Sequence, residues 1–444
     1  MKIFKAYDIR GVYGDNLNED IIYKIGRAYV LKFKPKIVTV GYDGRVSSPS
    51  LFKAIVKGIT DQGCDVVDIG LVSTPMMYFS SWNFPEYDGG LMVSASHNPP
   101  KYNGVKMVKK NSVPISGETG IYELGRMIED LPELPVKKGS VVKQINLLVP
   151  YVNHSLTYKN NDFSKYKIVV DTANGVGGPM CDSFFKKLGC EFIHLFPEVD
   201  GTFPNHEANP LKKENNADLI KSVNENNADI GIGFDGDADR CGFVDEKGQI
   251  VPSDFIVALI AKSILMKNPG KKILYDVRCS KVVDDVIREN GGIPGRCHVG
   301  HSLVKVQMHK EGAYFAGELS SHFYLQAEHY AEAPFFVILK ILELMDNENK
   351  TLSELVEPLK KYFHTGEINS KVENKDAKMK ELAEKFKDAN NISWLDGVTV
   401  EYDDWWFNVR PSNTEPYLRL NLEADTKELM EQKRDEVLSI IRST

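Results

Sequence analysis

The sequence lacks a long hydrophobic run. No stretch approaches the roughly 18 consecutive apolar residues that a membrane-spanning helix needs. The first ten residues carry charges at positions 2, 5, 8 and 10 and contain no apolar core of the kind found in signal peptides. We therefore expect a cytoplasmic protein without a membrane partner.

Cysteine is scarce, and no two cysteines lie close together in the sequence. The six cysteines of the chain are scattered and form no Cys-x-x-Cys pair, which argues against a zinc or redox motif. In a reducing cytoplasm such thiols mostly fill the hydrophobic core. They are Cys64, Cys181, Cys190, Cys241, Cys279 and Cys297.

An excess of positive charge is also missing. The 55 Lys and Arg residues are outnumbered by 62 Asp and Glu residues, which leaves a net charge of -7. This balance argues against a nucleic-acid partner, and no obligate protein partner is evident. A small anionic ligand would have to be held by a local cluster of cations against the overall field. With 444 residues, the chain is long enough for roughly three or four domains.

Strands alternate with helices from the first hundred residues onward. A buried strand beginning at Ile37, a helix over Ser50–Gln62, and strands at Val66–Ile69 and Leu91–Val93 succeed one another. This order predicts a largely parallel sheet that is covered on both faces. In such sheets, ligand-binding residues gather where the strands end.

The same order recurs twice and then changes. We expect a strand at Lys167–Asp171, a helix to Leu188 and a strand at Ala228–Phe234, and then a helix through Met266, a strand at Lys271–Asp276, a helix at Ser280–Glu289 and a strand near Ala313–Ala316. From Gly366, a strand, a helix over Lys375–Asn390, two short strands and a final helix from Thr426 predict an α+β domain. The fold class is thus three similar α/β domains, doubly wound with mixed sheets, and a smaller C-terminal α+β domain. The predicted domains are 1–143, 144–249, 250–362 and 363–444.

Ser96 stands where one of these strands ends. The apolar run Leu91–Val93 leads into Ser-Ala-Ser-His-Asn and two prolines, which predicts an exposed turn that presents Ser96 for covalent chemistry. Lys106, ten residues on, could move a proton or balance charge. A hydrolase triad fits poorly because no Gly-x-Ser-x-Gly elbow surrounds Ser96. An ordinary Ser/Asn turn is the simpler alternative.

A second stretch carries three carboxylates. Asp235, Asp237 and Asp239 follow the apolar run Ile230–Phe234 at alternate positions, and oxygen-only ligands of this kind suit Mg²⁺. Repulsion between three close carboxylates favours a bound cation over a solvated acidic turn. An EF-hand is excluded because Arg240 occupies the sixth position, where glycine is needed.

Two further stretches look like ligand loops. Gly317–His322 places an acid, a hydroxyl and an imidazole at alternate positions, which suits sugar hydroxyls if the backbone is extended. The segment 410–416 combines a guanidinium, hydroxyls and an amide in a turn, which suits a phosphate. A solvated loop and a Pro-bracketed turn are the alternatives. The candidate ligands are Glu318, Ser320 and His322 in the first, and Arg410, Ser412, Asn413 and Thr414, with Arg419 beyond, in the second.

Taken together, these motifs resemble the α-D-phosphohexomutase family, in its phosphomannomutase/phosphoglucomutase branch. The resemblance covers essentially the whole chain. It rests on Tyr-Asp-Ile-Arg-Gly at 7–11, Ser-His-Asn-Pro-Pro-x-Tyr-Asn-Gly-x-Lys at 96–106, Asp-Gly-Asp-Ala-Asp-Arg at 235–240, Gly-Glu-x-Ser-x-His at 317–322 and Arg-Pro-Ser-Asn-Thr-Glu-Pro at 410–416.

The resemblance implies four domains around a central cleft and a mutase activity. Such an enzyme would interconvert hexose 1-phosphates and hexose 6-phosphates, of mannose, glucose or both, through a phosphoserine and a 1,6-bisphosphate. It would use Mg²⁺, with glucose 1,6-bisphosphate or mannose 1,6-bisphosphate as activator, and its partners would be small sugar phosphates.

The resemblance also implies a role for each matching residue. Ser96 would be the phosphoserine, and Asp235, Asp237 and Asp239 with its phosphate would hold the metal. Lys106 and His301 would be the acid/base pair, with Arg10 and Arg240 beside the transferred group. The substrate-binding set would be Tyr7, His97, Asn98, Arg278, Glu318, Ser320, His322, Arg410, Ser412, Asn413, Thr414 and Arg419.

Some residues depart from the family pattern. Arg278 stands where lysine is frequent, so a guanidinium would contact the ligand there and a proton-transfer role is disfavoured. Ser321 replaces a small Gly or Ala, and the expected Asp-Asp-Gly after the sugar loop is missing. Asn413 argues against the phosphoglucosamine mutase branch, and His322 argues against a glucose-restricted enzyme. The alternatives left open are a phosphoglucosamine mutase, a phosphatase with Asp235 as nucleophile and a non-catalytic sugar-phosphate sensor.

Overall fold

A computed structural model of the chain describes residues 3–412 and 416–443. The chain divides into two compact units, which are described separately. Unit 1 comprises Met1–Ser253, Gly300–Phe315 and Ser320–Ser353, and unit 2 comprises Asp254–Val299, Ala316–Leu319 and Glu354–Thr444.

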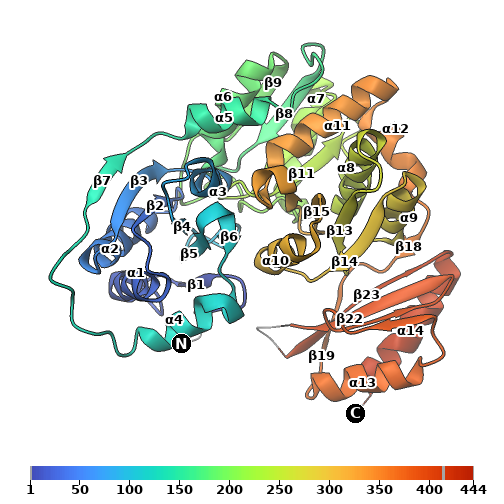
Figure 1. The fold of residues 1–444 in the computed structure, drawn as a ribbon. Coiled ribbons are helices and arrows are strands. Elements are labelled where there is room, and N and C mark those ends of the chain that lie inside the picture. Colours follow the sequence, from blue (N-terminus) through green and yellow to red (C-terminus); the bar gives the residue numbers. More distant parts are fainter. Residues whose placement is uncertain (1–2, 413–415, 444) are drawn as a thin grey trace. The chain divides into compact units, whose positions relative to one another are not determined.

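Unit 1 opens with a mixed sheet of order β1-β5-β4-β2-β3-β7, with β6 on the side of β5 (Figure 1). Alternate residues of β2 serve its two faces: Val38 and Val40 join the apolar cluster formed with α1 and α2, whereas Thr39 contacts Ser80 of α3. Helices therefore cover both faces, as the strand pattern predicts. The elements are β1 (Ile9–Val12), α1 (Glu19–Phe33), β2 (Ile37–Tyr42), α2 (Ser48–Asp61), β3 (Asp65–Leu71), α3 (Thr74–Asn83), β4 (Gly89–Val93), β5 (Tyr102–Lys109), β6 (Val113–Pro114), α4 (Tyr122–Met127) and β7 (Val141–Gln144).

A second mixed sheet of unit 1 has the order β12-β11-β10-β8-β9. Its strand β10 runs parallel to β8 and antiparallel to β11, so residues 235–240 form the hairpin between β10 and β11. Its elements are α5 (Leu148–Leu156), β8 (Lys167–Asp171), α6 (Gly177–Leu188), β9 (Glu191–Leu195), α7 (Ala217–Asn226), β10 (Ile230–Phe234), β11 (Cys241–Asp245) and β12 (Ile250–Val251). Unit 1 also contains α10 (His301–Glu311), β16 (Phe323–Leu325), β17 (Ala331–Glu332) and α11 (Pro334–Glu348).

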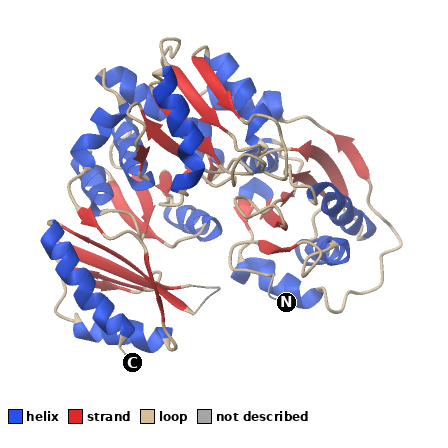
Figure 2. Cartoon of the chain, turned by 180° about the vertical axis from the view of Figure 1, so that it is seen from behind, coloured by secondary structure: helices blue, strands red, loops and turns tan. Residues whose placement is uncertain are grey.

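Unit 2 contains a parallel strand pair and the C-terminal sheet, whose order is β18-β23-β22-β21-β20 with β19 beside β23. Helices lie along one face of the C-terminal sheet (Figure 2). Along β22, Trp405, Phe407 and Val409 belong to the apolar cluster formed with α13 and α14, so Arg410 points to the opposite face. The elements are α8 (Ser253–Lys267), β13 (Lys272–Asp276), α9 (Lys281–Glu289), β14 (Ile293–Cys297), β18 (Phe363–His364), β19 (Ile368–Lys371), α13 (Lys375–Lys385), β20 (Asn391–Ser393), β21 (Val398–Glu401), β22 (Trp405–Pro411), β23 (Tyr417–Ala424) and α14 (Lys427–Arg442). The unit boundaries fall within β15 (Phe315–Gly317) and α12 (Leu352–Val356).

Several of the sequence predictions differ from the structure. Helix α13 ends at Lys385 instead of Asn390, and β9 and α7 lie between α6 and β10, where no element was predicted. Strand β14 and helix α10 lie between α9 and β15, where no element was predicted. The segment after α13 forms the four strands β20 to β23 rather than two short ones. Strand β14 reads Ile-Pro-Gly-Arg-Cys, which carries neither strand propensity nor alternation, and its pairing with β13 decides its conformation.

All six cysteines are buried and free, as expected for core filler. Among the described helices, none offers an apolar stretch long enough to cross a bilayer.

Helices α1 and α2 touch through backbone at two glycines. A Cβ atom on Gly58 would lie 2.1 Å from the carbonyl oxygen of Tyr23, and one on Gly26 would lie 2.6 Å from that of Ile55. Only hydrogen atoms fit at these two points, so the spacing of the helices depends on them.

We expect Gly58→Ala to destabilise unit 1. Overpacking typically costs about 1 to 3 kcal/mol, which exceeds the gain of about 1 kcal/mol in helix propensity. The midpoint of thermal unfolding, followed by circular dichroism, should fall. Lys53→Ala, at an exposed position of the same helix, should leave it unchanged, and an equal or higher midpoint for Gly58→Ala would contradict the close packing.

Candidate active site

Ser96 lies in the connection between β4 and β5 and is buried, with 1% of its surface exposed. The prediction of an exposed turn was therefore wrong. The Ser96 hydroxyl donates a hydrogen bond of 2.7 Å to Oδ2 of Asp235, so the hairpin between β10 and β11 covers it. The Ser96 backbone is left-handed, with φ of 50°, and its N–H donates to the hydroxyl of Ser94.

The three aspartates of the β10–β11 hairpin converge. Asp235, Asp237 and Asp239 each offer a carboxylate oxygen within 4.8 Å of the other two, and all three are buried. Oδ2 of Asp237 accepts hydrogen bonds from Thr74 at 2.6 Å and Ser94 at 3.2 Å. Among the described residues, Oδ1 of Asp237 has no hydrogen-bond partner, and Oδ1 of Asp239 has none either, although Nε2 of His322 lies 3.3 Å from it. Buried acceptors without donors indicate a missing cation.

Lys106 brings a positive charge to this cluster from the neighbouring strand β5. Its ammonium lies 2.7 Å from Oδ2 of Asp237 and also contacts Asp239. Burial lowers the pKa of Lys106, but the three aspartates outweigh burial and raise it. Burial and then the charges of Asp239 and Asp237 raise the pKa of Asp235. In the absence of a metal, Lys106 therefore acts as a counterion and holds its proton firmly.

A second group of cations lies near Ser96. Nδ1 of His97 is 3.3 Å from the Ser96 hydroxyl, and burial, followed by the charges of Arg240 and Arg10, lowers its pKa well below the usual value. Arg10 donates to the side chains of Asn98 and Asp8. A neutral imidazole therefore lies beside the hydroxyl, and two guanidinium groups lie close enough to that imidazole to lower its pKa, a setting that favours an anion.

Arg240 also contacts the predicted sugar loop. Its Nε donates to Nε2 of His322 at 3.2 Å, and Nδ1 of His322 lies 3.0 Å from the Ser320 hydroxyl. The backbone of this loop is not extended as predicted, because Ser321 is left-handed with φ of 64°. A Gly at this position would carry no strain. The Ser321 hydroxyl lies 2.6 Å from that of Ser253.

His301 is the first residue of α10 and is half-buried, with both ring nitrogens shielded from solvent. Neither ring nitrogen has a hydrogen-bond partner among the described residues, and burial, followed by the charges of Lys305 and Lys106, lowers its pKa well below the usual value. The Tyr7 ring meets it edge-on at 6.5 Å. Gly300 has φ of 118°, and a Cβ there would lie 2.5 Å from that ring. His301 is therefore a neutral imidazole, able to accept a proton.

Several residues near the aspartates were missed by sequence reasoning. Thr74 and Ser94 hold Asp237, and both follow the ends of strands, the same signal that identified Ser96. Glu332 lies close to Asp239 and His322 in a second potential metal group, but Lys305 pairs with it at 2.6 Å. This ion pair balances the charge of Glu332, so the three aspartates are the better metal ligands.

In unit 2, Arg278 and Glu318 come together. Asp276 binds the Arg278 guanidinium in a bidentate pair, at 3.0 and 2.6 Å, and accepts the N–H of Leu319. Burial lowers the pKa of Arg278, but Asp276 and then Glu318 outweigh it and raise the pKa. Glu318 belongs to unit 2, whereas Ser320 and His322 belong to unit 1.

A cationic cluster lies on the face of the C-terminal sheet opposite α13 and α14. Arg410 and Arg419 stand opposite each other on β22 and β23, where like charges repel, and both bind Glu367. Burial and then the charge of Arg278 lower the pKa of Arg410. Arg419 reaches the Ser412 hydroxyl at 3.4 Å, and Lys375 donates to the Ser412 carbonyl at 2.8 Å. Glu367 and Lys375 were not predicted, and Asn413 and Thr414 lie outside the described residues.

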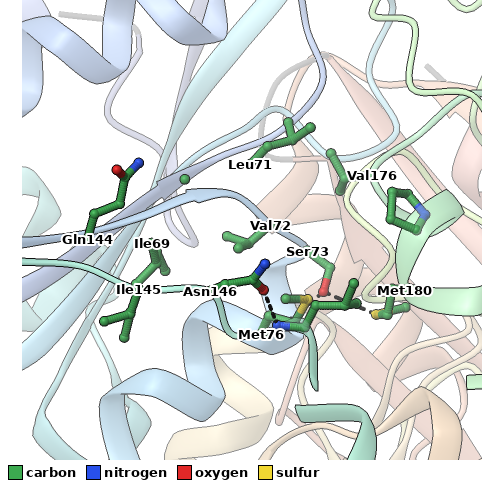
Figure 3. Close-up of a pocket in the computed structure, with 13 residues that line it drawn as sticks. Ile69, Leu71, Val72, Ser73, Met76, Gln144, Ile145, Asn146, Val176 and Met180 are labelled. Carbon is green, nitrogen blue, oxygen red and sulfur yellow. Dashed lines mark hydrogen bonds between the residues drawn. The ribbon is translucent and has the colours of Figure 1, made fainter. Parts of the chain in front are cut away.

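A separate cavity of about 500 Å³ lies in unit 1 between the end of β3, the start of α3 and the start of α6 (Figure 3). Mostly apolar side chains line it, including Val72, Met76 and Val176. The hydroxyl of Ser73 points across it to the sulfur of Met180, at 3.2 Å. None of the predicted site residues is among the described residues that line it, so we do not count it as part of the site.

Four consecutive family models match the chain. They are those of phosphoglucomutase/phosphomannomutase α/β/α domain I at residues 1–130, domain II at 149–248, domain III at 252–362 and the C-terminal domain at 367–440. The predicted fold class, three α/β domains and a C-terminal domain, is thus confirmed, whereas the predicted boundaries remain predictions.

Known proteins resemble the chain over its full length. A phosphomannomutase of Methanocaldococcus jannaschii is 41% identical over 446 residues, which cover 99% of this chain and 98% of the relative. The crystal structure of a phosphoglucomutase/phosphomannomutase family protein from Burkholderia thailandensis has a TM-score of 0.91 at 36% identity, with 99% and 97% of the chains covered. Aspergillus fumigatus N-acetylphosphoglucosamine mutase, solved in complex with GlcNAc-6P and magnesium, shares the fold at 14% identity, a TM-score of 0.62 and 99% and 95% coverage.

We expect Lys106→Met to destabilise the metal-free protein most at neutral pH. Burial acts to raise the pKa values of Asp237 and Asp239, but Lys106 and other groups outweigh it and lower both. A carboxyl group with a lowered pKa stabilises the fold at high pH and loses this contribution as the pH falls. Without Lys106 that contribution disappears, and breaking a buried pair costs about 3 to 5 kcal/mol.

Unfolding by denaturant in the presence of a chelator, between about pH 3 and pH 7, measures this effect. The stability gap between wild type and Lys106→Met should widen as the pH rises. Lys109→Met, on the same strand, serves as the control and should show a small gap at every pH. A large, pH-independent gap for Lys106→Met would contradict the counterion role.

Proposed function

The chain belongs to the phosphoglucomutase/phosphomannomutase family and is a phosphohexomutase, which interconverts hexose 1-phosphates and hexose 6-phosphates; we propose that it does so through a phosphoserine at Ser96. The resemblance read from the sequence is thus confirmed at the level of family and reaction. That reaction is favoured over the alternatives of a phosphatase, a sugar-phosphate sensor and a phosphoglucosamine mutase. Which residues carry it out is the subject of the proposal.

One observation carries the proposal: the Ser96 hydroxyl lies 2.7 Å from Asp235, within a buried cluster of three carboxylates and Lys106. Phosphoryl transfer needs an aligned oxygen nucleophile and neutralisation of charge on the transferred group, and little else from the protein. Arg10, Arg240 and Lys106 supply the cations. A solvated Ser/Asn turn would not need them.

In the proposed cycle, phospho-Ser96 gives its phosphoryl group to the 6-hydroxyl of a hexose 1-phosphate. The Ser96 Oγ–P bond breaks, a bond from P to the sugar oxygen forms, and the hydroxyl proton passes to a base. We assign this base to His301, because neither of its ring nitrogens has a hydrogen-bond partner among the described residues. The resulting 1,6-bisphosphate reorients and returns its 1-phosphoryl group to Ser96, which leaves the 6-phosphate as product.

A mutase also needs a site for the phosphate that does not react. The cluster of Arg410, Arg419 and Ser412 in unit 2 suits this role, because two guanidinium groups and a hydroxyl converge beside Lys375. We propose that Asn413 and Thr414 complete it. Glu318, Ser320 and His322 would bind the sugar hydroxyls, and Tyr7, His97, Asn98 and Arg278 would contact the substrate.

Asp235, Asp237 and Asp239 fit Mg²⁺, because they offer oxygen ligands only and Oδ1 of Asp237 has no hydrogen-bond partner among the described residues. When bound, the ion would neutralise charge on the Ser96 phosphate. We propose that this chain uses magnesium, and that glucose 1,6-bisphosphate or mannose 1,6-bisphosphate serves as its activator. Activity on both mannose and glucose phosphates, and a cytoplasmic location, are also part of this proposal.

We expect Ser96→Ala to lose nearly all turnover while it still binds substrate, because the variant lacks the oxygen that carries the phosphoryl group. The rate of glucose 6-phosphate formation from glucose 1-phosphate, with magnesium and glucose 1,6-bisphosphate present, measures turnover. Calorimetry measures binding. Ser116→Ala, which alters a buried serine that caps a helix, is the control and should stay active.

The location of the phosphate gives a second test. Peptide mapping after reaction with labelled bisphosphate should place the label on the peptide containing Ser96, in a form stable to hydroxylamine. A hydroxylamine-sensitive label on the peptide containing Asp235 would overturn the phosphoserine and support an aspartyl phosphate.

We expect magnesium to raise the thermal midpoint of the wild-type protein, since ligands that bind only the folded state stabilise it. Asp237→Asn should remove most of this shift, because it replaces a ligand oxygen in the centre of the cluster. Asp245→Asn, at the far end of β11, is the matched control and should retain the shift. An undiminished shift in Asp237→Asn would place the ion elsewhere.

A further inference from the structure

Arg45 is a buried arginine that no motif of the sequence analysis included. It follows strand β2 in the turn Asp43-Gly44-Arg45, and its side chain is fully shielded from solvent. A buried guanidinium is costly unless its charge is paired and its donors are satisfied. What Arg45 binds therefore indicates why it is there.

The five N–H groups of Arg45 all have acceptors, and four of these belong to the segment that carries Ser96. Nε donates to Asp43 at 3.1 Å. One terminal nitrogen donates to the carbonyls of Ser96 and Asn98, at 2.7 and 2.6 Å. The other donates to the carbonyls of Pro99 and Tyr102, at 2.8 and 3.1 Å. One side chain thus gathers four backbone oxygens from seven consecutive residues.

The Ser96 segment needs such a partner. A left-handed conformation at a residue other than glycine costs about 1 to 2 kcal/mol, and Ser96 has φ of 50°. Two prolines follow and supply no N–H donors, so the carbonyls of this segment cannot be satisfied by a regular hairpin ladder. Arg45 binds four of them, those of Ser96, Asn98, Pro99 and Tyr102, with one rigid, planar group.

Arg45 also ties this segment to the metal hairpin. The carbonyl oxygen of Ser96 that accepts from Arg45 would lie 2.7 Å from a Cβ on Gly236, between Asp235 and Asp237. The guanidinium stands over the ring of Phe203 at 5.3 Å, and Phe203 in turn packs near Gly236. The Ser96 backbone is thus fixed between Arg45 and the hairpin that receives its hydroxyl.

We propose that Arg45 is a positioning residue for phosphoryl transfer, which holds the Ser96–Tyr102 backbone so that Oγ of Ser96 points at the carboxylate of Asp235. This inference rests on the proposed function of Ser96. Arg45 contacts the carbonyl oxygens and not the reacting oxygen. A displacement of about 1 Å at the nucleophile can cost roughly 100-fold in rate, so its effect falls on turnover.

Arg45→Lys is the sharpest test, because lysine keeps the charge but loses the planar fork of five donors. We expect kcat for the conversion of glucose 1-phosphate to fall by about 10- to 100-fold, with KM changed less than about threefold. Transfer from glucose 1,6-bisphosphate to Ser96, followed by intact mass after brief mixing, should slow by a similar factor.

Arg27→Lys is the matched control. Arg27 lies in the same domain, donates to Gln62 at 2.9 Å and also binds a backbone carbonyl, that of Pro132. Since these contacts are remote from Ser96, its kcat should stay within about twofold of wild type. If Arg45→Lys does not fold, Arg45→Gln, which keeps two neutral donors, replaces it.

Each outcome decides between explanations. A wild-type kcat in Arg45→Lys, or equal losses in kcat and substrate affinity, would overturn the positioning role. Failure of both Arg45 variants to fold would also overturn it and make Arg45 a requirement for folding alone. If wild-type Ser96 takes no label from the bisphosphate, the proposed function fails instead, since that result does not involve Arg45.

Discussion

The active site depends on the repulsion between three buried carboxylates. Asp235, Asp237 and Asp239 lie too close together to be charged without cations, and Lys106 is the cation that the chain itself provides. Oδ1 of Asp237 and Oδ1 of Asp239 make no hydrogen bond among the described residues, so they are available to a second cation. The surrounding polar groups follow from this need: Thr74 and Ser94 fix Asp237, and Ser96 donates to Asp235.

The charged and polar side chains around this cluster are held in place by their neighbours. His97 and His301 are half-buried, and desolvation of their rings, followed by the charge of nearby cations, lowers their pKa values and keeps both imidazoles neutral. The cations themselves, Arg10 and Arg240, have partners that fix their direction. A transferred phosphate would thus meet preoriented donors rather than flexible side chains, which is how electrostatic stabilisation of a transition state is achieved at low cost. In unit 2, the shared acid Glu367 holds Arg410 and Arg419 in the same way.

Much of the fold could be read from the sequence because its strands are apolar runs that end in polar turns. Strand β8 matches its predicted bounds, and α2, β10 and β13 differ by one or two residues. The misses have a physical origin. Strand β14 contains Pro and Gly, and its conformation depends on pairing with β13. In the long strands β22 and β23, large aromatic and charged residues alternate with smaller apolar ones, which hid the length of these strands in the sequence.

The sequence by itself determined the candidate side chains, because Ser96, the three aspartates and the Arg410 turn stand at strand ends and carry functional groups suited to phosphate and metal. Only the tertiary structure decided how they work. It buried Ser96 under a hairpin about 140 residues away in sequence, made Lys106 a counterion, and brought in Arg45, Thr74, Glu367 and Lys375. Those four were invisible beforehand because their roles arise from long-range hydrogen bonds, which leave no periodic or local signal in the chain.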